Sequence, residues 1–140
     1  MFVAGFNKKP QPNEVVFQPK DLPSIVGRIS DSARVAEQSV DKAGLVSFGP
    51  YISLGKGKYE VLIKYSSVGS VDQQVGLFDV LDSVSATEIS KASLVGTDGA
   101  VQEVRIRFKS REWTPRQFEF RSHWNGLFDL KVYQIILREI

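Results

Sequence analysis

The sequence predicts an all-β domain made of two stacked antiparallel sheets. From residue 22 onward, runs rich in Val, Ile, Phe and Tyr alternate with glycines and small polar clusters. Short apolar runs separated at this pace are typical of a β-sandwich or barrel. No segment sustains an apolar face at helical spacing. With 140 residues, the chain is long enough for one domain with a two-layer core of its own.

Within the predicted strands, alternate side chains divide between two faces. Successive residues of a strand point to opposite sides, so the odd-numbered residues from Tyr59 to Tyr65 share one apolar face. In the same way Phe118 and Phe120 are expected to point inward and their neighbours outward. The predicted strands cover residues 46–54, 59–65, 75–81, 101–108, 117–123 and 127–138.

The remaining segments are predicted to be turns and connections. Residues 1–24 contain four prolines, so we expect an irregular lead-in that includes an edge strand at residues 15–17. The glycine-rich stretch at residues 55–58 is predicted to be a hairpin turn between two neighbouring strands. Only residues 31–38 and 83–91 would allow a turn or a short helix.

The charge pattern argues against a nucleic-acid partner. The net charge is +2, and the Lys and Arg residues are spread among acids. Binding to a phosphate backbone calls for a basic patch or stripe, and the only local basic run is Arg105, Arg107, Lys109 and Arg111. The chain has no cysteine, which excludes disulfides, thiolate nucleophiles and cysteine-based zinc sites.

The sequence also lacks the usual membrane signals. No stretch approaches the roughly 20 apolar residues that a membrane span needs. The first residues do not show a basic segment followed by an apolar one, as a secretory signal would. We therefore expect neither a membrane span nor a signal peptide.

The side chains needed for catalysis do not occur as a set. His123 is the only histidine, no serine stands in a Gly-x-Ser-x-Gly motif, and the acids are scattered without a pairing signature. Nucleophilic and acid–base catalysis both need a partner group held in place. We therefore expect a protein that is not an enzyme. A small hydrolase or lyase acting through Asp79 or His123 is the catalytic alternative.

Five residues are candidates for contact with a ligand. Arg121, His123 and Trp124 end a predicted strand just before a turn, so they would bring two donors and a ring to the rim of the sandwich. Asp79 is a carboxylate within an apolar strand, so it is either hydrogen-bonded inside or in contact with a ligand. Trp113 lies in a polar turn, where a large ring needs a partner. For Trp124 the alternative is that it caps the core beside the turn, and for Trp113 it is packing under its own turn.

The order of several motifs along the chain is also informative. Gly-Pro-Tyr at residues 49–51, Gly-Lys-Tyr at 57–59, Phe-Asp-Val at 78–80 and Phe-Glu-Phe-Arg at 118–121 precede a closing strand at 130–137. This order resembles the non-catalytic carbohydrate-binding modules of the galactose-binding jelly-roll type. It looks most like the modules attached to bacterial glycosyltransferases and other enzymes of surface-polysaccharide assembly. The resemblance covers residues 25–138 and consists mainly of hydrophobic spacing.

The resemblance implies a jelly-roll binding domain in residues 25–140 that recognises a glycan and tethers a linked catalytic domain to it, in the bacterial cytoplasm. Only Asp79 and Arg121 lie in segments that match by position. Many modules of this type hold a structural calcium with an acidic pair near their start, and here only Glu14 is available. We therefore expect no cofactor and no metal, with a structural calcium as the alternative. The rival function is protein–protein interaction or oligomerisation through the outward strand faces.

Overall fold

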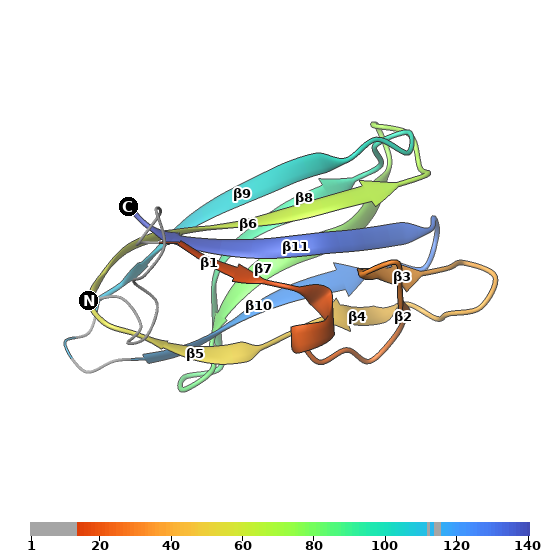
Figure 1. The fold of residues 1–140 in the computed structure, drawn as a ribbon. Coiled ribbons are helices and arrows are strands. Elements are labelled where there is room, and N and C mark those ends of the chain that lie inside the picture. The colour runs from red at the N-terminus through yellow and green to blue at the C-terminus, as the bar shows by residue number, and fades with distance from the viewer. Residues whose placement is uncertain (1–13, 112, 114–115) are drawn as a thin grey trace.

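The chain folds as a sandwich of two antiparallel sheets. The computed structural model describes residues 14–111, 113 and 116–140. In Figure 1 the sheet that contains β11 and β6 lies in front of the sheet that contains β10 and β7. The predicted all-β jelly-roll sandwich is confirmed. The expected lead-in at residues 1–13 lies outside the described residues, and its boundary at residue 24 stays a prediction.

Sheet A has six strands among the described residues, in the order β2-β3-β11-β6-β9, with β1 also paired to β11. β1 covers the residues for which an edge strand was expected and pairs with the C-terminal half of β11. The strands are β1 (Glu14–Phe17), β2 (Arg28–Ser30), β3 (Ala33–Ala36), β6 (Gly57–Ser67), β9 (Gln102–Ser110) and β11 (Leu130–Glu139).

Sheet B has five strands in the described part of the chain, in the order β4-β10-β7-β8, with β5 also paired to β10. The strands are β4 (Gly44–Ser47), β5 (Pro50–Leu54), β7 (Gln74–Asp82), β8 (Thr87–Val95) and β10 (Arg116–Trp124). β9 and β8 are therefore the last strands of their sheets on one side of the sandwich.

The core forms between the two sheets from the faces that the alternation predicted. Tyr59, Val61, Ile63 and Tyr65 of β6 are buried, and so are Phe118 and Phe120 of β10. Phe108 joins the two layers, since its ring centroid lies 5.5 Å from that of Tyr59 and 5.4 Å from that of Phe118. Fully burying one large apolar side chain is worth about 1.5–3 kcal/mol, so this shared layer stabilises the packing of the two sheets.

Two buried tyrosine hydroxyls keep hydrogen-bond partners inside the core. The Tyr65 hydroxyl donates to the Val95 carbonyl at 2.7 Å and thereby links β6 to β8 across the sandwich. The Tyr59 hydroxyl donates to the Gly55 carbonyl at 2.8 Å. Burial, and secondarily the charge of Glu139, raises the pKa of Tyr59 to about 12.

The predicted hairpin at residues 55–58 is wrong. β5 pairs with β10 in sheet B, whereas β6 pairs with β9 and β11 in sheet A. The glycine-rich stretch is therefore a crossing from one sheet to the other. Turn residues indicate where a strand ends, but the identity of the next strand's partner depends on the packing of the whole domain.

The two segments that would have allowed a short helix hold turns and strands instead. Residues 31–32 form a turn before β3, and residues 83–86 form a turn before β8. In the described residues, the only helical turn is the 3₁₀ turn η1 (Pro19–Asp21). No helix in that part of the chain is long and apolar enough to cross a lipid bilayer.

A bulge changes the alternation within β11. The register with β6 shifts between Val132 and Gln134, so Tyr133 is the extra residue. Leu130 and Val132 point into the core before the shift, and Ile135 and Leu137 do so after it. The hydroxyl of Tyr133 lies 2.8 Å from the Ser66 hydroxyl oxygen.

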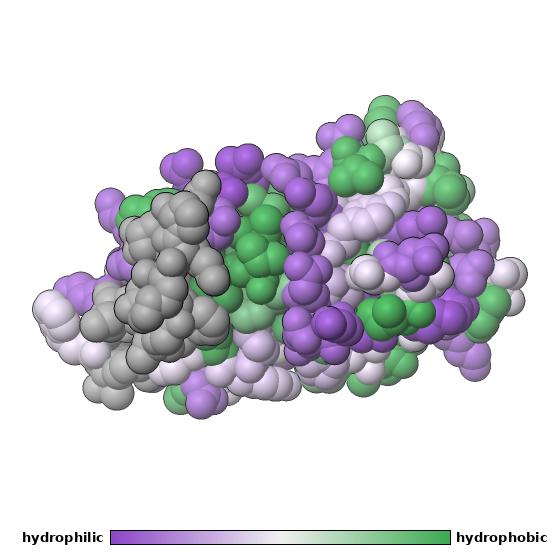
Figure 2. Space-filling view, in the orientation of Figure 1, coloured by the Kyte–Doolittle hydropathy of each residue, from purple (hydrophilic) through white to green (hydrophobic). Residues whose placement is uncertain are grey.

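The outer face of sheet A carries an apolar band beside a polar one (Figure 2). Strand register places Val16, Ile136 and Leu62 in one row across β1, β11 and β6. The adjacent row is charged and consists of Glu14, Arg138, Glu60 and Arg107. Because Leu62 and Ile136 are buried, only Val16 of the apolar row is substantially exposed.

Candidate ligand-binding face

A cluster of three predicted site residues lies on the outer face of sheet B. Arg121 donates to both oxygens of Asp79, from Nε at 2.8 Å and from Nη2 at 2.6 Å. His123 Nε2 lies 3.2 Å from the same carboxylate. The Asp79 side chain is 1% exposed, whereas those of Arg121 and His123 are 23% and 35% exposed. The carboxylate thus holds two donors that reach the surface, and we call this group the Asp79 cluster.

Strand pairing explains why residues 42 positions apart meet here. β10 and β7 are neighbours, and Arg121 stands directly opposite Asp79 in the register. Lys91 of β8 stands opposite Asp79 on the other side. Directly opposed residues on one face of a sheet have their Cβ atoms about 5 Å apart, which is within reach for these side chains. The sheet therefore lines up a cation, an acid and a second cation.

The electrostatics favour an ionised Asp79. Burial alone would raise its pKa, but hydrogen bonds with His123 and Arg121 outweigh burial and hold the pKa well below its ordinary value. The pKa of Glu88 shifts in the opposite direction, because a hydrogen bond with Asp79 raises it. Glu88 also lies 3.7 Å from the Lys91 ammonium. The face therefore offers both hydrogen-bond donors and a carboxyl group that accepts.

A glycine lets β7 approach β10 beside the cluster. A Cβ on Gly76 would lie 2.1 Å from the carbonyl oxygen of His123, which is closer than two such atoms can approach. Only glycine fits a strand position where another backbone comes this near. Gly76 thus helps to set the position of His123 relative to Asp79.

Trp124 does not belong to this face, which corrects the expectation from the sequence. It is the last residue of β10 and is 2% exposed, with its ring within the hydrophobic core. Its indole nitrogen donates to the Phe128 carbonyl at 2.7 Å. A ring packed and hydrogen-bonded in this way has no surface left for a ligand.

Trp113 is exposed but lies apart from the cluster. It precedes β10, whereas His123 and Trp124 end that strand, so a whole strand of about 30 Å separates them. The Trp113 side chain is 82% exposed, and the ammonium of Lys56 stands 4.2 Å from its ring centroid. Packing under the turn, the alternative considered from the sequence, does not occur.

One exposed aromatic residue was not among the candidates from the sequence. Tyr51 is 46% exposed on β5, which pairs with β10. Its φ of 64° lies in the left-handed region, which is uncommon for an aromatic residue. The Gly49-Pro50 pair before it was the available signal, because it marks an irregular backbone at this position.

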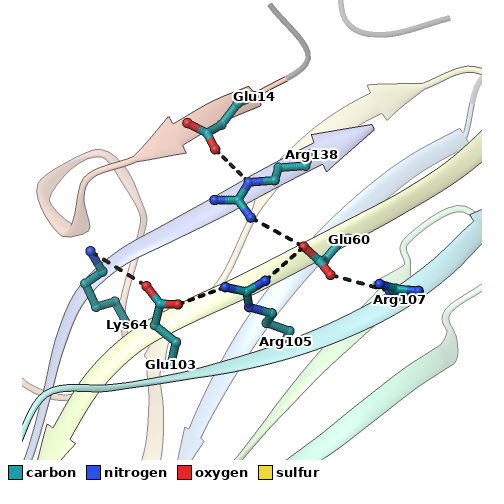
Figure 3. Close-up of polar contacts among 7 residues, drawn as sticks. All are labelled: Glu14, Glu60, Lys64, Glu103, Arg105, Arg107 and Arg138. Carbon is teal, nitrogen blue, oxygen red and sulfur yellow. Dashed lines mark hydrogen bonds and ion pairs between the residues drawn. The ribbon is translucent and has the colours of Figure 1, made fainter. Parts of the chain in front are cut away.

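The outer face of sheet A is a weaker candidate because its charges satisfy one another (Figure 3). Glu60 is the centre of a network in which Arg107, Arg138 and Arg105 approach its carboxylate at 3.4, 3.5 and 3.9 Å. Glu14 pairs with Arg138, and Glu103 pairs with both Lys64 and Arg105. Such a network leaves few unpaired groups for a ligand.

The Asp79 cluster is suited to binding more than to bond cleavage. Asp79 and His123 are in contact, but the hydroxyl of the adjacent Ser122 lies in the core, 2.8 Å from that of Ser47. The described residues contain no group of three or more His, Cys, Asp or Glu side chains that could hold a metal. Glu14, the acid considered for calcium, is paired with Arg138 at 2.6 Å.

Similarity to known proteins is found at the level of the fold. No family model matches the chain, and neither does any curated protein. A carbohydrate-binding module of lichenase 5A from Cellvibrio mixtus, solved with cellotriose, shares 12% identity at a TM-score of 0.59, covering 90% of this chain and 97% of its own. The C-terminal family 6 module of the laminarinase LamC from Zobellia galactanivorans shares 15% identity at 0.59, covering 90% and 99%.

A third similar structure bears on the question of metal. A family 36 carbohydrate-binding module in complex with calcium and xylotriose shares 11% identity at a TM-score of 0.52, covering 86% of this chain and 97% of its own. At these identities the likeness establishes a common jelly-roll fold. The expectation of no bound metal therefore stays a prediction.

Proposed function

We propose that this protein is a non-catalytic carbohydrate-binding domain whose glycan lies on the outer face of sheet B. The observation that carries the proposal is the Asp79 cluster, in which a buried carboxylate holds Arg121 and His123 at the surface. The similarity of the fold to modules solved with cellotriose and xylotriose supports it.

The chemistry of the cluster matches that of a sugar. A sugar ring has a rim of hydroxyls that donate and accept, and Arg121, His123 and Glu88 provide both kinds of partner. Arg121 is already oriented by Asp79, so little side-chain entropy is lost when it binds. Tyr51 is the exposed ring on the neighbouring strand β5 that would contact an apolar sugar face. A shallow site of this kind is expected to bind in the millimolar range, about −4 kcal/mol.

Weak binding would serve a tethering role. We propose that the domain holds a linked glycosyltransferase or other polysaccharide-assembly enzyme on a bacterial glycan in the cytoplasm. Linking a weak binder to an enzyme raises the local concentration of the polymer at the enzyme without tight affinity. The motif order in the sequence supports this finer proposal.

The test is a chemical-shift titration of the protein with a panel of neutral oligosaccharides, comparing wild type with Arg121→Lys. Lysine keeps the charge beside Asp79 but loses the planar pair of donors, so we expect binding at least about 10-fold weaker with a small change in Tm. Arg105→Lys makes the same replacement on the outer face of sheet A and is expected to bind like wild type.

Shifts confined to residues of β7, β8 and β10 would support the proposed face. Glycan-induced shifts on sheet A alone would place the site elsewhere. The rival function, oligomerisation through an outer strand face, predicts a dimer in size-exclusion chromatography and no response to any sugar. That result would replace the proposal.

A further inference from the structure

A groove lies beside the C-terminal part of β9. Its walls come from β7, β8, β9 and β10, and its volume is about 470 Å³. Pockets that hold small ligands measure roughly 300–1,000 Å³, so the space is large enough for a sugar unit. The groove lies near the turn that contains Trp113, far along β10 from the Asp79 cluster, and we call it the β9 groove.

The rim of the β9 groove is strongly cationic. Arg107, Lys109, Arg111 and Arg116 line it, against a single carboxylate, Asp82. Arg107 and Lys109 come from alternate positions of β9, about 7 Å apart along the backbone, and Arg111 follows just beyond the end of the strand. Like charges at this spacing lie within one Debye length at physiological salt, so they repel one another unless an anion is bound.

Two of these cations differ from those on the outer face of sheet A. In Figure 3, Arg138, Arg105 and Lys64 each have a carboxylate at distances of 2.6 to 3.8 Å. Of the groove's cations, Arg107 is likewise paired with Glu60, and Arg116 is paired with Asp82. Lys109 and Arg111, by contrast, form no ion pair within the described part of the chain.

Arg116 is held in place within the groove. Its Nε donates to Asp82 Oδ2 at 3.1 Å, and its side chain is 28% exposed. Burial would raise the pKa of Asp82, but the hydrogen bonds from Arg116 and from the backbone of Ser85 and Val84 lower it on balance. Since Asp82 takes only Nε, the two terminal nitrogens of the guanidinium can still donate to a ligand carboxylate.

The floor of the β9 groove is apolar. Ile89, Phe108 and Phe118 line it beneath the cations. An apolar floor suits the C–H face of a sugar, whereas a free phosphate or a nucleic-acid backbone would need only the charges. Charges along an edge strand also discourage pairing with another chain, but that role does not require a groove with such a floor.

We infer that the β9 groove binds an acidic glycan through a sugar carboxylate, that is, a uronic-acid unit. The inference builds on the proposed glycan-binding function and adds a second site of different specificity. The carboxylate lies against Arg116 and Lys109, and the sugar ring lies over the apolar floor.

The experiment measures the affinity of the whole chain for trigalacturonate and for its methyl ester, which has the same sugars without the charge. We expect the acid to bind at least about 10-fold more tightly than the ester, and the difference to shrink when salt rises from about 20 to about 200 mM. Chemical shifts should move in β9 and at the indole of Trp113. Inorganic phosphate and a short single-stranded DNA are titrated in parallel.

Lys109→Gln/Arg111→Gln tests the groove itself. Both side chains are exposed, so the double variant should fold normally and lose at least about 10-fold in affinity for the acid. Lys20→Gln/Lys42→Gln removes the same net charge elsewhere on the surface and should bind like wild type. Equal losses in both variants would show that only net charge matters and would overturn the inference.

The remaining outcomes are also decisive. Equal affinity for acid and ester, or tighter binding of phosphate or DNA, overturns the assignment of a uronic-acid glycan. Binding of neutral glycans on sheet B without any response to the acid overturns this inference and leaves the proposed function standing. No response to any glycan overturns both.

Discussion

At the scale of single residues, burial decides which polar and aromatic side chains are available to a ligand. Asp79 is enclosed and acts through Arg121 and His123, which reach the surface. Trp124 and Trp113 look equivalent in the sequence, yet one is 2% and the other 82% exposed. The difference arises because Trp124, at the end of β10, packs in the core and donates to the Phe128 carbonyl, whereas Trp113 faces solvent.

The lowered pKa of Asp79 predicts a specific loss of stability in acid. Its pKa is lower in the folded than in the unfolded chain, so its contribution is complete above pH 5 and is lost as pH falls through 3.8 toward the folded pKa. Asp79→Ala should lower the free energy of unfolding by about 3 kcal/mol at pH 7, because Arg121 loses its partner. The variant should also lose less stability than wild type as the pH falls. Urea unfolding of both proteins between pH 7 and pH 3 measures the effect. The same change of unfolding free energy with pH in both proteins would contradict this prediction.

At the scale of the elements, close backbone approach sets the geometry of the binding face. β7 reaches β10 closely enough that Gly76 has no room for a side chain beside the His123 carbonyl. The bulge in β11 has a similar consequence in sheet A, where it turns Tyr133 away from the apolar core. A few backbone irregularities therefore decide which side chains share a face.

Gly76→Ala is predicted to push β7 and β10 apart beside the Asp79 cluster. We expect a loss of about 2 kcal/mol or more in unfolding free energy, together with weaker binding on sheet B. Gly57→Ala is the matched control, because its nearest new contact, the Tyr59 hydroxyl, lies at an ordinary 3.4 Å. Urea midpoints and glycan titrations check both variants, and a Gly76→Ala protein as stable as the control would contradict the close approach.

At the scale of the whole molecule, one core joins both sheets, and the paired and unpaired cations lie in different places. The layer around Phe108 and the Tyr65–Val95 hydrogen bond link sheet A to sheet B. The ion pairs around Glu60 lie on the outer face of sheet A and include Arg107, whereas Lys109 and Arg111 of the β9 groove have no ion pair within the described residues. The domain therefore presents two chemically different surfaces.

The fold is predicted to need no metal. We expect Tm to be the same with EDTA and with millimolar calcium, because Glu14 is paired with Arg138 and the core is held by apolar contacts. A thermal melt under both conditions measures this. A rise of several degrees with calcium would instead indicate a site, since a ligand that binds only the folded state stabilises it.

The strand pattern was predictable because it depends on local geometry. The alternation in β6 and β10 predicted which residues enter the core, and Phe118 and Phe120 are buried as expected. β8 escaped prediction because most of its residues are polar and exposed, as on many edge strands. Asp79, Arg121 and His123 were each singled out, but their contact depends on β7 and β10 becoming neighbours.

The sequence by itself determined an all-β chain with alternating faces. These features follow from the period-two geometry of a strand and from residue chemistry, both of which are local. The tertiary structure alone decided that β5 and β6 belong to different sheets, that Asp79 meets Arg121, that Trp124 is buried, and that a basic run along β9 lines a groove. Those outcomes depend on how distant strands pair and pack, because that pairing minimises the exposed apolar surface of the whole chain.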